Sequence, residues 1–122
     1  MKIRIQGNSI RLRLKQNEVA SLSETGLVED RLAFGPDPSS QHLVYRLESA
    51  DVDAMSTEFQ NGCVTVQLPR ADASEWLTNE VVGFEHNVES EGNEPISILV
   101  EKDFKCRPEE EGLYPNPKAG EC

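Results

Sequence analysis

The stretch KIRIQGNSIRLRL, residues 2–14, decides the fold that the sequence predicts. Apolar and basic residues alternate on both sides of a glycine–asparagine pair, and a period of two is typical of half-buried β-strands. Gly7-Asn8 suits a two-residue hairpin loop, because both residue types tolerate positive φ. The resulting register pairs Ile3 with Leu12 on one face. We therefore expect an antiparallel hairpin with one apolar face.

The other face of this hairpin carries basic side chains. The same register places Arg4 opposite Arg11 and Lys2 opposite Arg13. Like charges directly opposite each other destabilise a strand pair, so the arrangement requires a compensating anion. That anion is either a phosphate or carboxylate ligand held by arginine forks or an acidic side chain on a neighbouring strand. The acidic residues considered are Glu29, Glu58, Glu85 and Glu101. We call Lys2, Arg4, Arg11 and Arg13 the basic ladder and take it as the candidate ligand-binding site.

A second stretch, STEFQNGCVTVQL at residues 56–68, repeats the pattern. Asn61-Gly62 is the strongest short-range hairpin signal, and a shift of 54 residues places it on Gly7-Asn8. The same shift places Trp76 on Leu22 and, further along, Ile98 on Val44 without a gap. The sequence therefore predicts an internal duplication of a strand–strand–helix–strand–strand unit. The alternative is that any β-rich chain with two tight hairpins shows some correspondence of this kind.

The segments between and after the hairpins supply the other elements of each unit. A short helix is expected over residues 15–25, ended by Gly26. A second helix is expected around Trp76, with Asp72 or Ser74 as its N-cap. Further strands are expected over 27–34, 43–47, 81–88 and 96–104. The predicted fold is α+β, with about eight antiparallel strands in a sheet or barrel and two short helices.

The chain has 122 residues, the length of one domain. We predict a single domain over residues 1–104, made of the repeats 1–50 and 54–104. Residues 105–122 have a different composition, with three prolines and the acidic run Glu109–Glu111. This Pro- and Glu-rich tail is expected either to drape over the domain or to remain mobile.

Charge and hydropathy exclude several classes of protein. The net charge of −10 argues against a general nucleic-acid binder, because phosphate backbones require a basic surface. No apolar run approaches the roughly 20 residues of a membrane span, and the charged N-terminus does not have the pattern of a signal peptide. We therefore expect a cytoplasmic protein without a nucleic-acid or membrane partner.

The cysteines and histidines do not form a recognisable metal site. Cys63, Cys106 and Cys122 are odd in number and widely spaced, which is typical of reduced thiols, although Cys106 and Cys122 could close a loop. Their spacing to His42 and His86 matches no zinc-ligand pattern. No sequence motif for a catalytic nucleophile or a phosphate-binding loop is present. We expect neither a metal, nor a cofactor, nor catalytic residues.

Two resemblances add to this interpretation. The opening residues 1–14, with EKDFKC at 101–106 and PNP at 115–117, resemble a small bacterial family of domains of unknown function across essentially the whole chain. At the level of fold, the chain is similar to the triphosphate-tunnel (CYTH-type) enzymes, whose barrels are lined by basic side chains. That resemblance implies that the basic ladder holds a triphosphate inside a barrel. The chain departs from the family at Lys2, Arg4 and Gln6, where those enzymes carry glutamates and a lysine for metal and phosphate.

The sequence thus leads to two functional hypotheses and one further possibility. The first is a non-enzymatic module that binds a small anion or a protein partner at the basic ladder. The alternative is a CYTH-like triphosphate-binding phosphohydrolase or a decayed relative of one. A homodimer that covers an unpaired sheet edge is also possible. The direction in which Arg4 and Arg11 point, into a cavity, onto acidic strands or into solvent, separates the first two.

Overall fold

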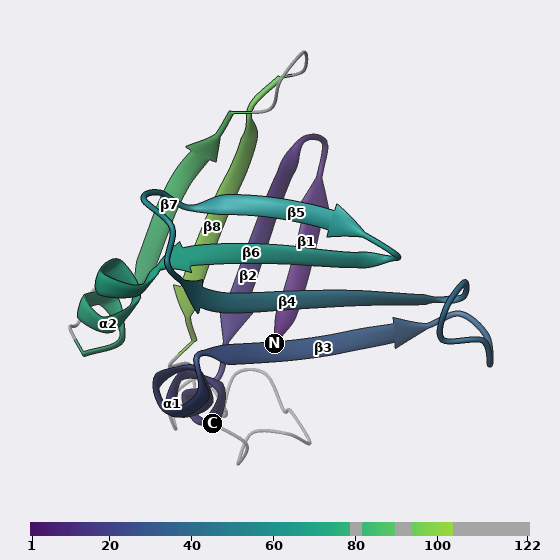
Figure 1. The fold of residues 1–122 in the computed structure, drawn as a ribbon, viewed down its shortest axis with the longest axis horizontal. Coiled ribbons are helices and arrows are strands. Elements are labelled where there is room, and N and C mark those ends of the chain that lie inside the picture. The colour runs from purple at the N-terminus through teal and green to yellow at the C-terminus, as the bar shows by residue number, and fades with distance from the viewer. Residues whose placement is uncertain (79–81, 90–93, 104–122) are drawn as a thin grey trace, which may run out of the picture.

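The computed structural model describes residues 1–78, 82–89 and 94–103, and within these ranges the chain forms eight strands and two helices (Figure 1). The strands are β1 (Lys2–Gln6), β2 (Ser9–Leu14), β3 (Leu27–Ala33), β4 (His42–Ala50), β5 (Ser56–Gln60), β6 (Cys63–Pro69), β7 (Gly83–Val88) and β8 (Ile96–Lys102), and the helices are α1 (Gln16–Thr25) and α2 (Arg70–Thr78). The predicted α+β class is confirmed. The predicted tail over 105–122 lies outside the described residues.

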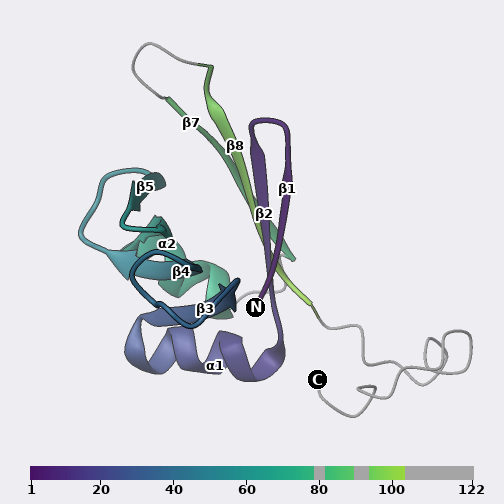
Figure 2. The ribbon, with the colours of Figure 1, turned by 90° about the vertical axis from the view of Figure 1, so that its right-hand side faces the viewer.

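The strands form two separate four-stranded sheets. Sheet A has the order β1-β2-β8-β7, and sheet B has the order β3-β4-β6-β5. The four hairpins are antiparallel, as expected, whereas the central pairs β2–β8 and β4–β6 are parallel. Parallel neighbours require a long connection, which leaves no local signal in the sequence. Neither sheet closes into a barrel, and the strands of one sheet cross those of the other (Figures 1 and 2).

Each sheet takes one hairpin from each predicted repeat. Sheet A combines β1–β2 with β7–β8, and sheet B combines β5–β6 with β3–β4. Exchanging the repeats therefore maps one sheet onto the other. Equivalent hydrogen bonds join the two hairpins within each sheet: the amide of Ser97 donates to Asn8 at 3.1 Å, and that of Val44 donates to Gly62 at 2.8 Å. This arrangement supports an internal duplication.

The alignment of the two repeats requires gaps, whereas the sequence predicted a single shift of 54 residues without a gap. At the far end of each central pair, the amide of Lys102 donates to Val82 and that of Ser49 donates to Gly26. These bonds make Lys102 equivalent to Ser49, so that Ile98 corresponds to Tyr45 and not to Val44. The reason is that the connections around β3 and β7 differ in length. The positions of turns and helices in the sequence therefore do not predict which residues of the later strands are equivalent, because the loops between them vary in length.

The apolar core lies between the two sheets and is itself nearly symmetric. Its equivalent pairs are Leu12 with Val66, Leu14 with Leu68, Leu22 with Trp76, and Leu47 with Val100, all at most 3% exposed. Ile5 lies on the same face of β1 as the core residues but is 58% exposed, because it is at the tip of its hairpin. The two sheets thus bury the same positions of each repeat.

Lys102 is the charged exception within this core. It is 2% exposed, its Nζ donates to the carbonyl oxygen of Trp76 at 2.7 Å, and the same atom lies 5.3 Å from the centroid of the Trp76 ring. Burial lowers the pKa of the Lys102 ammonium group. The bond occupies a carbonyl in the last turn of α2, where a helix lacks internal donors. Lys102 therefore stabilises the C-terminal end of this helix.

The helices begin and end by different means. In α1, the side chain of Glu18 accepts a hydrogen bond from the amide of Lys15 at 2.9 Å, and Gly26 ends the helix with φ of 75°. Helix α2 begins at Arg70, directly after the strand that ends at Pro69. Asp72 therefore lies in its first turn and is not the N-cap, contrary to prediction. The other predicted N-cap, Ser74, is likewise inside the helix.

The two predicted hairpin turns form in the predicted register but with different backbones. In the second turn Asn61 and Gly62 both have positive φ, of 52° and 73°. In the first turn Gly7 has φ of 54°, whereas Asn8 is not in the positive region. The Asn8 side chain instead donates to the carbonyl oxygens of Glu94 and Pro95 at 3.0 and 2.8 Å. This residue thus ties the tip of the first hairpin to the segment before β8.

Candidate anion-binding face

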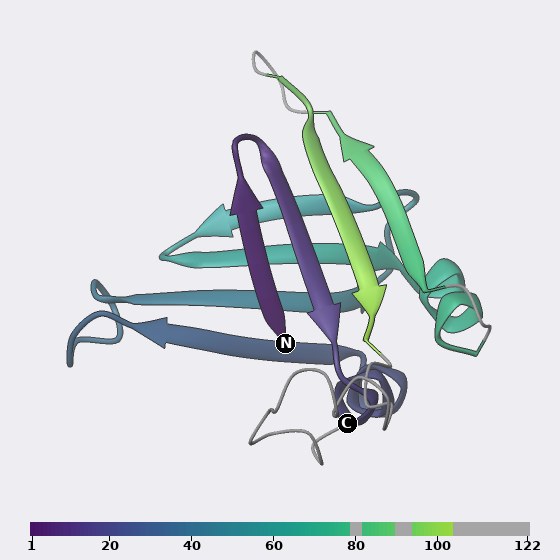
Figure 3. The same cartoon turned by 180° about the vertical axis from the view of Figure 1, so that it is seen from behind.

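The basic ladder lies on the outer face of sheet A. Leu12 and Leu14 point into the core, so the alternating residues Arg11 and Arg13 point outward. Strand β1 pairs with β2 in the predicted register and adds Lys2 and Arg4 to the same face. This face is turned toward the viewer in Figure 3. The resemblance to the tunnel enzymes implied that the ladder lines a barrel, and this expectation is wrong, because the ladder lies on an outer face.

Glu101 compensates half of the ladder. Arg11 donates from Nε to Oε1 at 3.0 Å and from Nη2 to Oε2 at 3.1 Å, and Arg13 donates from Nε and Nη2 to Oε2 at 3.2 and 3.1 Å. The carboxylate is brought there by the parallel pairing of β2 with β8, which places it opposite Arg13. Among the four acidic residues considered from the sequence, Glu101 is thus the one that forms ion pairs with the ladder.

The environment of Glu101 keeps it ionised. Burial raises the pKa of its carboxyl group, because its side chain is only 14% exposed, but hydrogen bonds and charge from Arg11 and Arg13 outweigh that effect and hold the pKa below its ordinary value. A carboxylate shared by two guanidinium groups fixes the direction of both. The two arginines are therefore held in place before any ligand binds.

The other half of the ladder has no such partner. Within residues 1–78, 82–89 and 94–103, Lys2 and Arg4 form no ion pair, and both are exposed. Glu85 lines the same hollow as Arg4 without forming an ion pair to it. Two cationic groups of the ladder therefore remain available to an external anion.

Two adjoining hollows open along the ladder. The first, of about 250 Å³, is lined by Arg4, Gln6, Ser9, Ile10, Arg11, Glu85, Ser97 and Leu99, and the second, of about 240 Å³, by Lys2, Ile3, Arg4, Arg11 and Arg13. Ser9 and Ser97 are directly paired across β2 and β8, so short side chains lie where the first hollow forms. Arg4 and Arg11 border both hollows. The sequence did not single out these serines, because their pairing is long-range.

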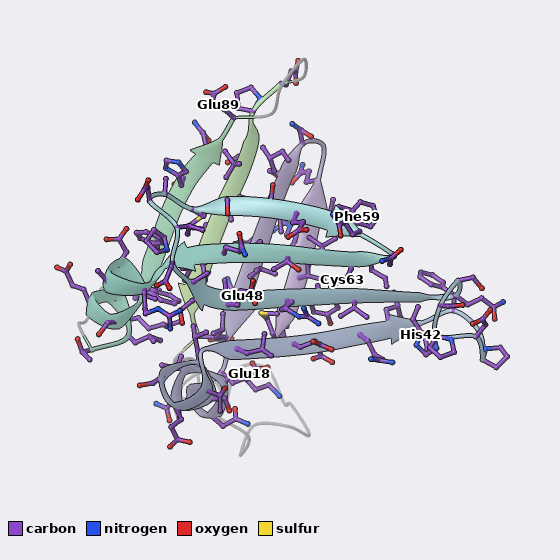
Figure 4. All side chains as sticks on the ribbon, in the orientation of Figure 1. Glu18, His42, Glu48, Phe59, Cys63 and Glu89 are labelled. Atoms are coloured by element: carbon purple, nitrogen blue, oxygen red, sulfur yellow. The ribbon has the colours of Figure 1, made fainter. Side chains whose placement is uncertain are left out.

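Sheet B carries a different set of residues at the equivalent positions. The hairpin β5–β6 has Ser56, Glu58, Thr65 and Gln67 where β1–β2 has the ladder. The counterpart of Glu101 is Glu48, which accepts a hydrogen bond from the amide Nε2 of Gln67 at 2.8 Å. Glu48 and Cys63 lie on the outer face of sheet B (Figure 4). The acidic position is thus common to both sheets, whereas the basic ladder is confined to sheet A.

The remaining candidates from the sequence are separate from one another. The Nε2 atom of His42 lies 3.0 Å from the Gly35 carbonyl oxygen, and its Nδ1 lies 3.2 Å from Arg31. Cys63 Sγ lies 3.6 Å from the Thr65 hydroxyl. In the part of the chain that the structure describes, no three His, Cys, Asp or Glu residues gather where a metal could bind. The predicted tail cysteines, Cys106 and Cys122, lie outside that part.

Comparison with known proteins assigns the chain to a family. Neither helix of the described residues is long and apolar enough to span a membrane. No curated protein and no solved structure matches the chain significantly. A model for the "Family of unknown function (DUF7009)" matches residues 1–118. The chain thus belongs to the DUF7009 family, in agreement with the first resemblance noted in its sequence.

Proposed function

We propose that this protein is a non-enzymatic binding module that takes a small anion, bearing phosphate or carboxylate groups, on the outer face of sheet A. The observation that carries this proposal is the uneven compensation of the basic ladder. Arg11 and Arg13 are held by Glu101, whereas Lys2 and Arg4 line the same second hollow without an ion pair in the described residues. An anion placed there meets the guanidinium groups that Glu101 orients and two cationic groups that form no ion pair within the described residues.

The chemistry of the face favours binding over catalysis. Glu101 is held ionised by two arginines, so it does not provide a proton near neutral pH. The first hollow is lined by guanidinium, amide and hydroxyl groups, which suit the recognition of oxyanions, together with the Glu85 carboxylate and two apolar side chains. A cytoplasmic location is part of the proposal and rests on the three widely spaced cysteines, a pattern typical of reduced thiols.

Isothermal titration calorimetry with inorganic phosphate and with tripolyphosphate tests the proposal. We expect tripolyphosphate to bind the full chain with a millimolar or lower Kd that weakens as salt is raised. Arg4→Gln should weaken binding about tenfold, or about 1.4 kcal/mol. Arg70→Gln is the matched control, because this exposed arginine on α2 pairs with Asp51 and lines neither hollow of the ladder. The absence of heat at millimolar ligand would reject the proposal.

A further inference from the structure

The sequence that follows β8 contains an acidic run, after the basic residues Lys105 and Arg107, that is opposite in charge to the basic ladder. Residues 109–111 are three consecutive glutamates, outside the described residues. We propose that this acidic segment binds the basic ladder of its own molecule and competes there with the external anion. The competition rests on the proposed function, whereas the contact itself does not. Its first support is charge complementarity, because Lys2 and Arg4 lack an ion pair within the described residues.

The point at which the described chain ends is the second support. Glu101 lies opposite Arg13 in the parallel pair, and Arg13 lies opposite Lys2 in the hairpin. Two residues after Glu101, the amide of Asp103 donates to the carbonyl oxygen of Leu14 at 2.7 Å. The acidic segment is therefore tethered at the end of sheet A where the ladder begins.

The length of the tether is the third support. Glu109 comes six residues after Asp103, and an extended chain spans roughly 3.3–3.6 Å per residue, or about 20 Å in all. Strand β1 lies two strands away from β8, which is about 10 Å across the sheet. Lys2 and Arg4 are about 7 Å apart along β1. The three glutamates can therefore reach both residues without full extension.

The tether also determines how strongly such a contact forms. Exposed ion pairs between side chains are individually weak and screened by salt. A short flexible connection raises the effective concentration of the segment to the millimolar range, which makes weak pairs sufficient. An anion with several charges competes with the segment for the same cations. The apparent affinity of the ladder for that anion is thus lower in the full chain than the ladder alone would give.

Amide NMR spectra of the full-length protein test the contact directly. The variant E109Q/E110Q/E111Q removes three negative charges from the segment. The variant E24Q/D72N/E75Q is its control, because it removes the same charge from exposed positions on the two helices. We expect the segment variant to shift the amide signals of Lys2, Arg4, Arg11 and Arg13, and 0.5 M NaCl to cause the same shifts in the unmodified protein. Unchanged ladder signals, or equal shifts in the control, would overturn the contact.

Tripolyphosphate titration of the same proteins tests the competition. We expect the segment variant to bind tripolyphosphate about three- to tenfold more tightly than the unmodified chain, with the helix control close to the unmodified value. Equal affinities for the segment variant and the unmodified chain would overturn the competition. If no form of the protein binds tripolyphosphate, the proposed function fails together with the competition, while the NMR comparison still decides whether the segment contacts the ladder.

Discussion

Sheets A and B resemble each other on their inner faces and differ on their outer faces. Leu14 and Leu68, from equivalent strands, are both fully buried. On the outer faces, Arg4 of sheet A corresponds to Glu58 of sheet B, and Arg13 corresponds to Gln67. Packing between the sheets restricts what the inner positions accept, whereas outer positions are free to change. The function proposed above is placed on the outer face of sheet A, where the two sheets differ.

One outer position is the same in both sheets and shows how the ladder is supported. Glu101 and Glu48 occupy equivalent sites on the two central strands and accept hydrogen bonds from the neighbouring hairpin. In sheet A the donors are two guanidinium groups, and in sheet B the donor is a neutral amide. The equivalent glutamates thus form an ion pair in sheet A and a neutral hydrogen bond in sheet B. Equivalent substitutions in the two sheets measure how these interactions differ in their contribution to stability.

The largest expected effect comes from the shared core. Leu14→Ala and Leu68→Ala should each lower the free energy of unfolding by about 2–5 kcal/mol, because each leaves a cavity at a fully buried site. Urea denaturation should give two values within about 1 kcal/mol of each other. A cost below about 1 kcal/mol for one substitution alone would show that the two halves of the core are not equivalent.

Substitutions in the two hairpin turns should differ in their cost to stability more than the two core substitutions do. At Gly62, φ is 73° and an added Cβ would lie 2.8 Å from the His42 carbonyl oxygen, whereas at Gly7 nothing lies within 4 Å of that Cβ. Gly62→Ala should therefore cost about 2–3 kcal/mol, and Gly7→Ala about 1 kcal/mol, the cost of the left-handed backbone alone. Thermal unfolding of both variants checks this order, and equal shifts in Tm would contradict it.

Substitution of the equivalent residues Glu101 and Glu48 should have different effects on stability, because only Glu101 pairs with charged groups. Glu101→Gln leaves two half-buried arginines without their anion, so the free energy of unfolding should fall by about 1–3 kcal/mol. Glu48→Gln should cost less than about 1 kcal/mol, because an amide oxygen still accepts from Gln67. Equal losses in urea denaturation would mean that charge is unimportant at Glu101.

The pH dependence of stability should follow the same carboxylate. The pKa of Glu101 is lowered in the folded protein, so its contribution is complete above the ordinary value of 4.5 and is lost as pH falls below that value. The difference in unfolding free energy between the unmodified protein and Glu101→Gln should therefore be constant from pH 7 to about pH 5.5 and shrink towards pH 3. A difference that stays constant down to pH 3 would contradict the assignment.

The smallest expected effect on stability is at the site of the proposed function. Arg4 is exposed and forms no ion pair within the described residues, so Arg4→Gln should change the free energy of unfolding by less than about 0.5 kcal/mol. The same substitution should weaken tripolyphosphate binding, as proposed above. A loss of stability above about 1 kcal/mol would assign a structural role to Arg4.

Structural features that depend on residues close together in the sequence could be predicted. The register that places Arg4 opposite Arg11 follows from alternation and a tight turn, and the structure confirms it. The pairing of β2 with β8, which brings Glu101 to Arg11 and Arg13, joins distant segments and has no local signal. From the sequence, Glu101 was accordingly one of four acidic residues, and nothing in the sequence showed which of them pairs with the ladder. The hollows along the ladder depend on the same pairing and were not predicted.

The parallel pair β2–β8 has a consequence for how the protein is made. During synthesis the first hairpin leaves the ribosome before β8, so one edge of β2 remains open until β8 is made. Open strand edges pair readily with other chains, and charged side chains protect them. Arg11 and Arg13 meanwhile carry their charges without Glu101. Arg11 and Arg13, which Glu101 holds in the finished fold, thus also protect this open edge against aggregation until β8 is synthesised.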